Sequence, residues 1–380
     1  MIMEKKINLG IDATNIRSGG GKTHLIEILD NIDFSTTKFN KVIIWGNKKI
    51  LKEIKNYGWL IKKDINISGH NYLYRFLWSF YILDFESKKS KCDLLFIPGG
   101  IYLGFHKNVV TLSQNMLPFD FKEIKRYGIS SKFLKLILLH YIYKLSFKKS
   151  KGIIFLTKYA KNKIQSFCKN LKRKKIIPHG INKNFFNKTK LFKIKNSSKE
   201  YKIIYLSSIE LYKNHENVIR AVSMLKKKIN LKISLHLVGP CTNSSLLSSL
   251  NKVIEKHDPD KKFIKYYGNI EYSKLNKILK KMDIGVFASS CENLPISLIE
   301  QMASGLPIAC SNKKPMTDIL MKNSYYFNPE NIEEIYKSLF ALLSNDKSQK
   351  KFSKKGIIEA KNFNWQNTSK LTFKFLETFI

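Results

Sequence analysis

The chain has 380 residues, 43% of them hydrophobic, and a formal net charge of +39 at pH 7. This length and apolar content suffice for two domains with real cores and exclude an intrinsically disordered chain. The charge comes from 63 lysines and only five arginines, which favours compositional drift or attraction to an anionic membrane surface over the arginine-rich readout of nucleic acids.

Short apolar runs alternate with longer helical patterns in the first half of the chain, which predicts α/β units around a parallel sheet. The expected strands cover residues 7–11, 41–45, 94–97, 109–112 and 152–156. Helices are expected over residues 23–30 and 130–147. A further helix over residues 71–85 is rich in aromatic residues, and is either a core helix or an apolar, cationic surface that could meet a lipid.

The second half repeats this alternation. Strands are expected over residues 202–206, 232–238, 263–266, 284–287 and 307–310, with a helix over 216–227. The predicted organisation is a first domain over 1–182, a linker rich in Lys and Asn over 183–200, a second domain over 201–355 and a final helix over 356–380. Ligands of open parallel sheets bind at the carboxyl ends of the strands. Two such domains facing each other would therefore hold both substrates in the cleft between them.

The cysteines and the chain start favour a cytoplasmic protein. The five cysteines are widely spaced, with no metal-ligand or disulfide pattern, which predicts reduced thiols. The first residues are polar and strand-like, unlike a signal peptide. No run approaches the roughly 18 apolar residues of a spanning helix, so we expect contact with a membrane at its surface only.

The most informative segment covers residues 291–311, C-E-N-L-P-I-S-L-I-E-Q-M-A-S-G-L-P-I-A-C-S. Glu292 and Glu300 are separated by seven residues. Pro295 favours a helix start between them, and Gly305 favours the end of that helix. This predicts Glu292 in the loop before a short helix and Glu300 about one and a half turns inside it.

The start of this helix is predicted to bind a diphosphate. Backbone N–H groups at Asn293 and Leu294 attract anions, whereas carboxylates accept hydrogen bonds from hydroxyls. A nucleotide sugar fits this arrangement, with its hexose at Glu292 and its ribose at Glu300. The alternative is an ordinary capped amphipathic helix whose glutamates face solvent.

The same segment resembles the donor-site signature of glycosyltransferase family 4. In that signature, Glu-x7-Glu with an embedded proline is followed by the residue types found here at Ala303, Gly305, Pro307 and Ile308. The resemblance implies a GT-B fold: two facing Rossmann-like domains, an interdomain cleft and a C-terminal helix returning to the first domain. It also implies a retaining transferase that uses a nucleotide-diphosphate sugar.

Residues 205–222 resemble the family segment that offers cations to the donor diphosphate. Lys213 matches the family's lysine, whereas the arginine position falls on Ser207 or Ser208, and the resemblance implies a donor contact at Ser208. This departure removes one cationic contact. A later turn, G-N-I, matches the family turn beside the nucleotide base, where the resemblance implies that the backbone of Ile270 reads the edge of the base.

A glycine-rich stretch, S-G-G-G-K-T, follows the first expected strand. Its glycines allow a backbone to approach a phosphate closely. Family 4 members carry a comparable loop near the donor diphosphate and acceptor, which implies donor contacts at Gly20 and Gly21. The stretch ends like a P-loop, but that motif requires a glycine where this chain has Ile16. The alternative is a plain tight turn.

Two amides stand where many family members have a histidine that contacts the donor sugar. Gln114 and Asn115 are predicted to hydrogen-bond a sugar or acceptor hydroxyl instead. The sequence Asp258-Pro259-Asp260 formally matches a metal–diphosphate motif of another transferase fold, but its Lys-flanked position predicts a turn. We expect no cofactor and no essential metal.

These features predict a cytoplasmic, membrane-peripheral, retaining glycosyltransferase. It would move a hexose or deoxyhexose from a nucleotide-diphosphate sugar to a growing, lipid-linked surface glycan such as lipopolysaccharide O-antigen or capsule. Glu292 and Lys213 are the predicted catalytic residues, and Glu300 the predicted ribose-binding residue. The alternatives are another GT-B enzyme, such as a phosphorylase or epimerase, and a basic nucleic-acid-binding protein.

Overall fold

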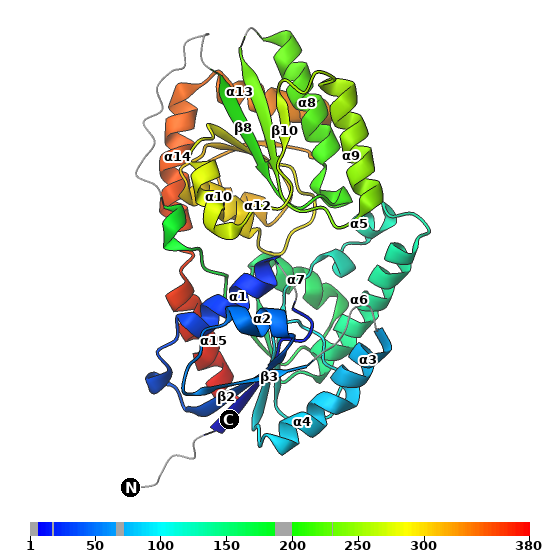
Figure 1. Ribbon diagram of the computed structural model, residues 1–380, viewed down its shortest axis with the longest axis vertical. Coiled ribbons are helices and arrows are strands. Elements are labelled where there is room, and N and C mark those ends of the chain that lie inside the picture. Colours follow the sequence, from blue (N-terminus) through cyan, green and yellow to red (C-terminus); the bar gives the residue numbers. More distant parts are fainter. Residues whose placement is uncertain (1–6, 17–18, 66–71, 187–199, 230) are drawn as a thin grey trace. The chain divides into compact units, whose positions relative to one another are not determined.

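The computed structural model describes residues 7–16, 19–65, 72–186, 200–229 and 231–380. The chain forms two compact units (Figure 1). The first comprises Met1–Ile124, Gly128–Gly180 and Asn364–Ile380, and the second comprises Lys125–Tyr127 and Ile181–Phe363. Most of the predicted linker, residues 187–199, lies outside the described residues, as does residue 71 of the predicted aromatic helix.

The first unit is built on a seven-stranded parallel sheet. Its strands are β1 (Ile7–Asp12), β2 (Phe39–Gly46), β3 (Leu60–Asp64), β4 (Leu94–Ile97), β5 (Val109–Ser113), β6 (Gly152–Phe155) and β7 (Arg173–Ile176). They lie in the order β3-β2-β1-β4-β5-β6-β7. The order reverses between β1 and β4, and ligands of such sheets bind where the carboxyl ends of strands meet at this point.

The helices of the first unit come from the N-terminal part of the chain and, in one case, from its C-terminal end. They are α1 (Gly19–Asp30), α2 (Lys48–Glu53), α3 (Tyr72–Leu77), α4 (Leu83–Lys89), α5 (Phe121–Lys125), α6 (Ser131–Lys149), α7 (Lys158–Phe167) and α15 (Trp365–Glu377), with a π-helical turn at Trp78–Ile82 and 3-10 turns at Phe34–Thr36 and Leu117–Phe119. Helix α15 contacts α1, because Ser369 Oγ donates a hydrogen bond to the carbonyl of Ile28 at 2.6 Å. The last helix of the chain is therefore part of the first unit.

The second unit has a six-stranded parallel sheet in the order β10-β9-β8-β11-β12-β13. Its strands are β8 (Tyr201–Leu206), β9 (Ile233–Val238), β10 (Ile264–Tyr266), β11 (Ile284–Phe287), β12 (Ile308–Ser311) and β13 (Tyr325–Phe327). Its helices are α8 (His215–Lys228), α9 (Ser244–His257), α10 (Tyr272–Leu279), α11 (Ile296–Ala303), α12 (Met316–Leu320), α13 (Ile332–Leu343) and α14 (Asp346–Ala360), with 3-10 turns at Lys183–Phe185 and Leu211–Lys213.

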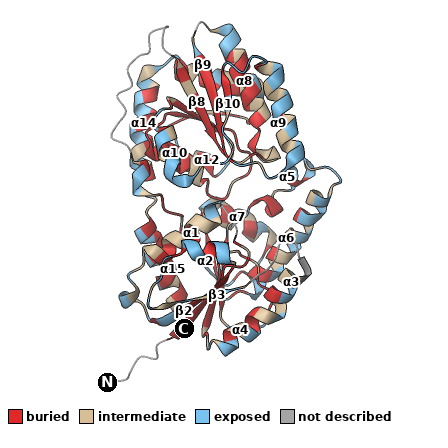
Figure 2. Ribbon diagram, viewed as in Figure 1, coloured by how far each residue is buried: buried red, intermediate tan, exposed pale blue. Residues whose placement is uncertain are grey.

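The sequence explains these elements locally. Strands β9, β11 and β12 are buried at every residue, as the red colour of the labelled strand β9 shows in Figure 2. Strands covered on both faces read as continuous apolar runs. Five α-helices of the described residues, α2, α9, α13, α14 and α15, begin at an asparagine whose side chain accepts a backbone hydrogen bond from the first turn. This capping satisfies N–H groups that the helix itself leaves unpaired.

All ten predicted strands are present, and the structure adds β3, β7 and β13. Each of the three lies at the edge of a sheet. Strands β3 and β7 each carry two lysines, as exposed edges commonly do, so they lack the apolar run that marks a strand in sequence. Among the described segments, no helix has the length and apolar character needed to cross a membrane.

Candidate functional site

The loops after β8 and β11 come together at the carboxyl ends of these two central strands of the second sheet. These two strands are paired where the strand order reverses, which is the ligand-binding position of open α/β sheets. The backbone N–H of Ser290 donates to the carbonyl of Tyr212 at 2.8 Å. Asn214 Nδ2 donates to the carbonyl of Ala288 at 2.9 Å. These hydrogen bonds hold the two loops against each other.

Lys213 and Glu292 form an ion pair between these loops. Their side chains are only 9% and 12% exposed, and Lys213 Nζ donates a hydrogen bond to Oε1 of Glu292. The ammonium also lies 5.0 Å from the ring centroid of Tyr212. The parallel sheet thus places in direct contact the two residues that the sequence predicted as catalytic, which are 79 positions apart.

Glu300 lies on α11, at the position in the helix that the sequence predicted, and is 4% exposed. Burial raises the pKa of its carboxyl from 4.5 to about 7, although a hydrogen bond with Tyr272 acts in the opposite direction. Asn293 and Leu294, in the loop before the helix, are also buried. Pro295 immediately precedes the first helical residue, one position earlier than its usual place inside the helix.

We expect the stability of the protein to fall as the pH rises through 7, because of Glu300. Between the usual pKa of 4.5 and its folded value of about 7, the folded state keeps a proton that the unfolded chain releases. The resulting stabilisation is present at low pH and is lost as the pH rises through the folded pKa, a change of about 3 kcal/mol. Urea unfolding at about pH 5 and about pH 8 measures it. Glu300→Gln should lack this part of the pH dependence, and equal pH dependence in both proteins would contradict the effect.

Two other predicted donor contacts lie in loops that also follow the carboxyl ends of strands in the second sheet. Ser208 follows β8, and Ile270 follows β10; both are half-buried. Gly239 joins these loops: its N–H donates to the carbonyl of Gly268 at 2.9 Å. With φ at +148°, Gly239 lies so close to the carbonyl of Ser207 that a side chain would collide with it.

The first unit holds the remaining predicted contacts. Gly20 and Gly21 lie in the first turn of α1, so they are helical and not part of a loop before the helix, because α1 begins at Gly19. Gln114, after β5, has its Oε1 only 2.7 Å from the position of a Cβ at Gly21, so a side chain there would displace it. Asn115 is exposed, and its Oδ1 accepts a hydrogen bond from the N–H of Leu117 at 3.1 Å.

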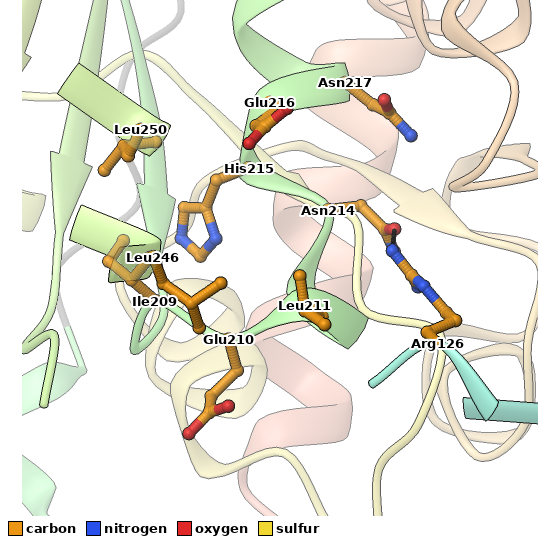
Figure 3. Close-up of a pocket in the computed structure, with 10 residues that line it drawn as sticks. All are labelled: Arg126, Ile209, Glu210, Leu211, Asn214, His215, Glu216, Asn217, Leu246 and Leu250. Atoms are coloured by element: carbon orange, nitrogen blue, oxygen red, sulfur yellow. Dashed lines mark hydrogen bonds between the residues drawn. The ribbon is translucent and has the colours of Figure 1, made fainter. Parts of the chain in front are cut away.

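A cavity of about 150 Å³ is lined by residues from the turn after β8, among them Leu211 and Asn214, and by residues of α8 and α9 (Figure 3). Arg126 also lines it, and its Nη2 donates to Oδ1 of Asn214 at 2.9 Å. His215 lines it too; burial first, and the charge of Lys213 second, lower its pKa to about 3, so its ring is neutral. The sequence prediction missed Arg126. The feature that could have drawn attention to it is that the chain has only five arginines.

Asp12 is a second polar residue that the sequence prediction overlooked. It ends β1, beside the point where the first sheet reverses order, and is 1% exposed. Its Oδ1 accepts hydrogen bonds from Thr14 Oγ1 at 2.6 Å and Trp78 Nε1 at 3.2 Å. Burial raises its pKa despite these hydrogen bonds. The sequence feature that could have identified Asp12 is its position, a carboxylate at the end of an apolar strand.

Comparison of the sequence with known proteins bears on the second unit most directly. Residues 187–358, which contain Lys213, Glu292 and Glu300, match the family model described as Glycosyl transferases group 1. The O-antigen chain mannosyltransferase B of Escherichia coli is 21% identical to the chain over 169 residues, 44% of either protein. The chain spans between 12% and 61% of the length of the curated relatives that it matches.

Solved structures resemble the chain over nearly its whole length. Sucrose-phosphate synthase from Thermosynechococcus elongatus superposes with a TM-score of 0.77 at 12% identity, covering 98% of this chain and 99% of that one. Anabaena Alr3699/HepE in complex with UDP-glucose has a TM-score of 0.71 at 12% identity, covering 98% and 100%. These similarities confirm the predicted fold class, the two Rossmann-like units of the GT-B fold.

Proposed function

We propose that this protein is a retaining glycosyltransferase. It moves a hexose or deoxyhexose from a nucleotide-diphosphate sugar to a growing, lipid-linked surface glycan such as lipopolysaccharide O-antigen or capsule. The observation that carries this proposal is the buried ion pair between Lys213, after β8, and Glu292, in the loop leading to Glu300. Both residues lie inside the segment that matches the family model. The names of the Escherichia coli mannosyltransferase and the Anabaena UDP-glucose complex support the glycan class and the donor class.

The proposed mechanism assigns a role to each charged group. Lys213 binds the donor diphosphate and stabilises the negative charge that develops there as the bond to the anomeric carbon breaks. Glu292 accepts hydrogen bonds from hydroxyls of the donor sugar and orients Lys213, whereas Glu300 accepts hydrogen bonds from the ribose. The acceptor hydroxyl attacks from the face that the diphosphate leaves, and the departing diphosphate oxygen takes the hydroxyl proton. The enzyme then needs no strong base of its own, because it holds the acceptor hydroxyl next to the diphosphate oxygen that takes the proton.

We also propose that the transfer needs no essential metal. Asp258, in the D-x-D sequence, is 3% exposed, and its carboxylate accepts hydrogen bonds from the backbone N–H groups of Lys262, Phe263 and Ile264 at 2.7–2.8 Å. The exposed carboxylate of Asp260 pairs with Lys262 at 2.7 Å. These contacts form a turn, as the sequence predicted, and engage the oxygens that a metal would require.

A thermal-shift panel of UDP, GDP, ADP and their common sugars, with EDTA present, tests the donor site. A nucleotide at about 100 times its dissociation constant should raise the free energy of unfolding by about 2.7 kcal/mol. At about pH 8, where the carboxyl of Glu300 is largely ionised, Glu300→Ala should weaken binding of the responding nucleotide by about 10- to 100-fold, because a hydrogen bond to a charged group is lost. The control is Glu255→Ala, an exposed glutamate on α9. Equal binding to the wild type and Glu300→Ala would contradict the ribose assignment.

The products then separate the proposed transferase from a phosphorylase or epimerase. A transferase forms a glycan product only when an acceptor is present, whereas an epimerase changes the donor without one and a phosphorylase consumes inorganic phosphate. Peripheral attachment to the cytoplasmic face of the membrane is part of the proposal, because the net charge of +39 favours an anionic surface.

A further inference from the structure

The outer face of α6 is apolar where a helix that faces water is normally polar. Its side chains Leu134, Leu138, Tyr141 and Leu145 are 63%, 59%, 58% and 55% exposed. Spacings of four, three and four residues place them on one side of the helix, along about 16 Å of its axis. The buried residues Leu136, His140, Tyr143 and Phe147 occupy the opposite side. We call the four exposed residues the α6 stripe.

Lysines border the α6 stripe. Lys135, Lys148 and Lys149 are exposed, and Lys144 Nζ lies 5.8 Å from the ring centroid of Tyr141. The helix contains no aspartate or glutamate. An apolar face bordered by lysine is typical of helices that lie in a membrane interface, where the long side chains reach the lipid phosphates.

A second group of exposed apolar side chains adjoins the C-terminal end of α6. Phe76, Tyr81, Phe85 and Phe105, which we call the aromatic cluster, are 47%, 58%, 66% and 67% exposed. Lys149 connects α6 to it, because its Nζ donates to the carbonyl of Leu103 at 2.5 Å and lies 5.0 Å from the ring centroid of Phe105. Helices α3, α4 and α6 also lie on the same side of the first unit in Figure 1.

We propose that the α6 stripe and the aromatic cluster form one surface that docks on an anionic lipid bilayer. Leucine and aromatic side chains enter the boundary between headgroups and acyl chains, and the lysines bind lipid phosphates. A second copy of the chain fits less well, because two faces bordered by lysine, on chains of net charge +39, repel each other. The inference rests on the proposed function insofar as a lipid-linked acceptor lies in the same bilayer.

Flotation of the full-length protein with vesicles tests this surface. We expect binding to phosphatidylcholine vesicles that contain about 30% phosphatidylglycerol, and at least about tenfold weaker binding to phosphatidylcholine alone. The variant Leu134→Gln/Leu138→Gln should bind the anionic vesicles about tenfold more weakly, since two apolar side chains no longer enter the interface. Lys144→Gln/Lys148→Gln should also bind more weakly and lose part of the salt dependence. The matched control is Phe340→Gln/Ile358→Gln, which replaces apolar residues of the second unit that are 41% and 45% exposed, and should bind like the wild type.

Failure of the wild type to float with anionic vesicles, or wild-type flotation of Leu134→Gln/Leu138→Gln, would overturn the proposal. A dimer detected by light scattering and lost in that variant, with vesicle binding unchanged, would assign the α6 stripe to a second copy. The variant should keep the unfolding temperature and the nucleotide-induced thermal shift of the wild type, because the replaced side chains face solvent. Loss of docking is thereby distinguished from failure of the proposed donor site.

Discussion

Lys213→Met is expected to lower the turnover number by about 10²- to 10³-fold. The ammonium is the positive charge that we propose to stabilise the departing diphosphate, and loss of one such group costs about 2.7–4 kcal/mol in the transition state. Methionine has a similar length and apolar stem, so the change removes the charge with little loss of packing volume. Initial rates at saturating donor, with the nucleotide identified by the thermal-shift panel, measure this effect.

The same variant tests the energetics of the ion pair. Because Glu292 is 12% exposed, Lys213→Met leaves a carboxylate nearly buried without its partner, which should cost about 3–5 kcal/mol of unfolding free energy. The control Lys262→Met removes a lysine that is 74% exposed and pairs with Asp260; such surface pairs contribute about 0–1 kcal/mol. Turnover within about threefold of the wild type in Lys213→Met would contradict the catalytic assignment.

Glu292→Ala is expected to reduce turnover by about a hundredfold while leaving nucleotide binding nearly unchanged. Glu292 is proposed to contact the donor sugar and to orient Lys213, and lost positioning affects the reacting geometry more than binding of the distant base. Comparing turnover with the dissociation constant for the nucleotide separates the two effects. The control Asp260→Ala removes an acidic partner that is 64% exposed.

A double-mutant cycle completes this test. Each single change leaves one charge of the pair buried alone, whereas Lys213→Met/Glu292→Ala leaves neither. The double variant should therefore be more stable than the sum of the single effects predicts, by about 1–3 kcal/mol. Additive changes in unfolding free energy would show that Lys213 and Glu292 do not stabilise each other. Wild-type turnover in Glu292→Ala would exclude Glu292 from the proposed mechanism.

Much of the fold could be predicted from the sequence. Strands such as β8 and β11 are apolar runs between turn residues, and α11 ends before Gly305, as predicted. The helix begins at Ile296, one residue after the proline that was expected at its first position. These signals are local, because helix starts and stops depend on neighbouring residues. The start of α1 at Gly19 was missed because glycine has a low helix propensity and reads as a loop.

The candidate site was only partly accessible from the sequence. The segment 291–311 and Lys213 were singled out by spacing and by resemblance, but neither feature predicts a direct contact between Lys213 and Glu292. That contact exists because β8 and β11 are neighbours at the reversal of strand order. Arg126 is 88 positions from Asn214, its hydrogen-bond partner, and no local pattern marks a contact over that separation.

The sequence by itself determined the α/β class, the strand pattern of the sheet interiors and the segment that carries Glu292 and Glu300. Only the tertiary structure decided which charges are buried and which apolar faces stay open. The pKa of about 7 at Glu300 arises from burial by surrounding elements, and α6 is apolar on both sides in sequence, so packing alone distinguishes its covered face from the α6 stripe. Burial is a property of long-range packing, whereas propensity and periodicity are properties of neighbouring residues.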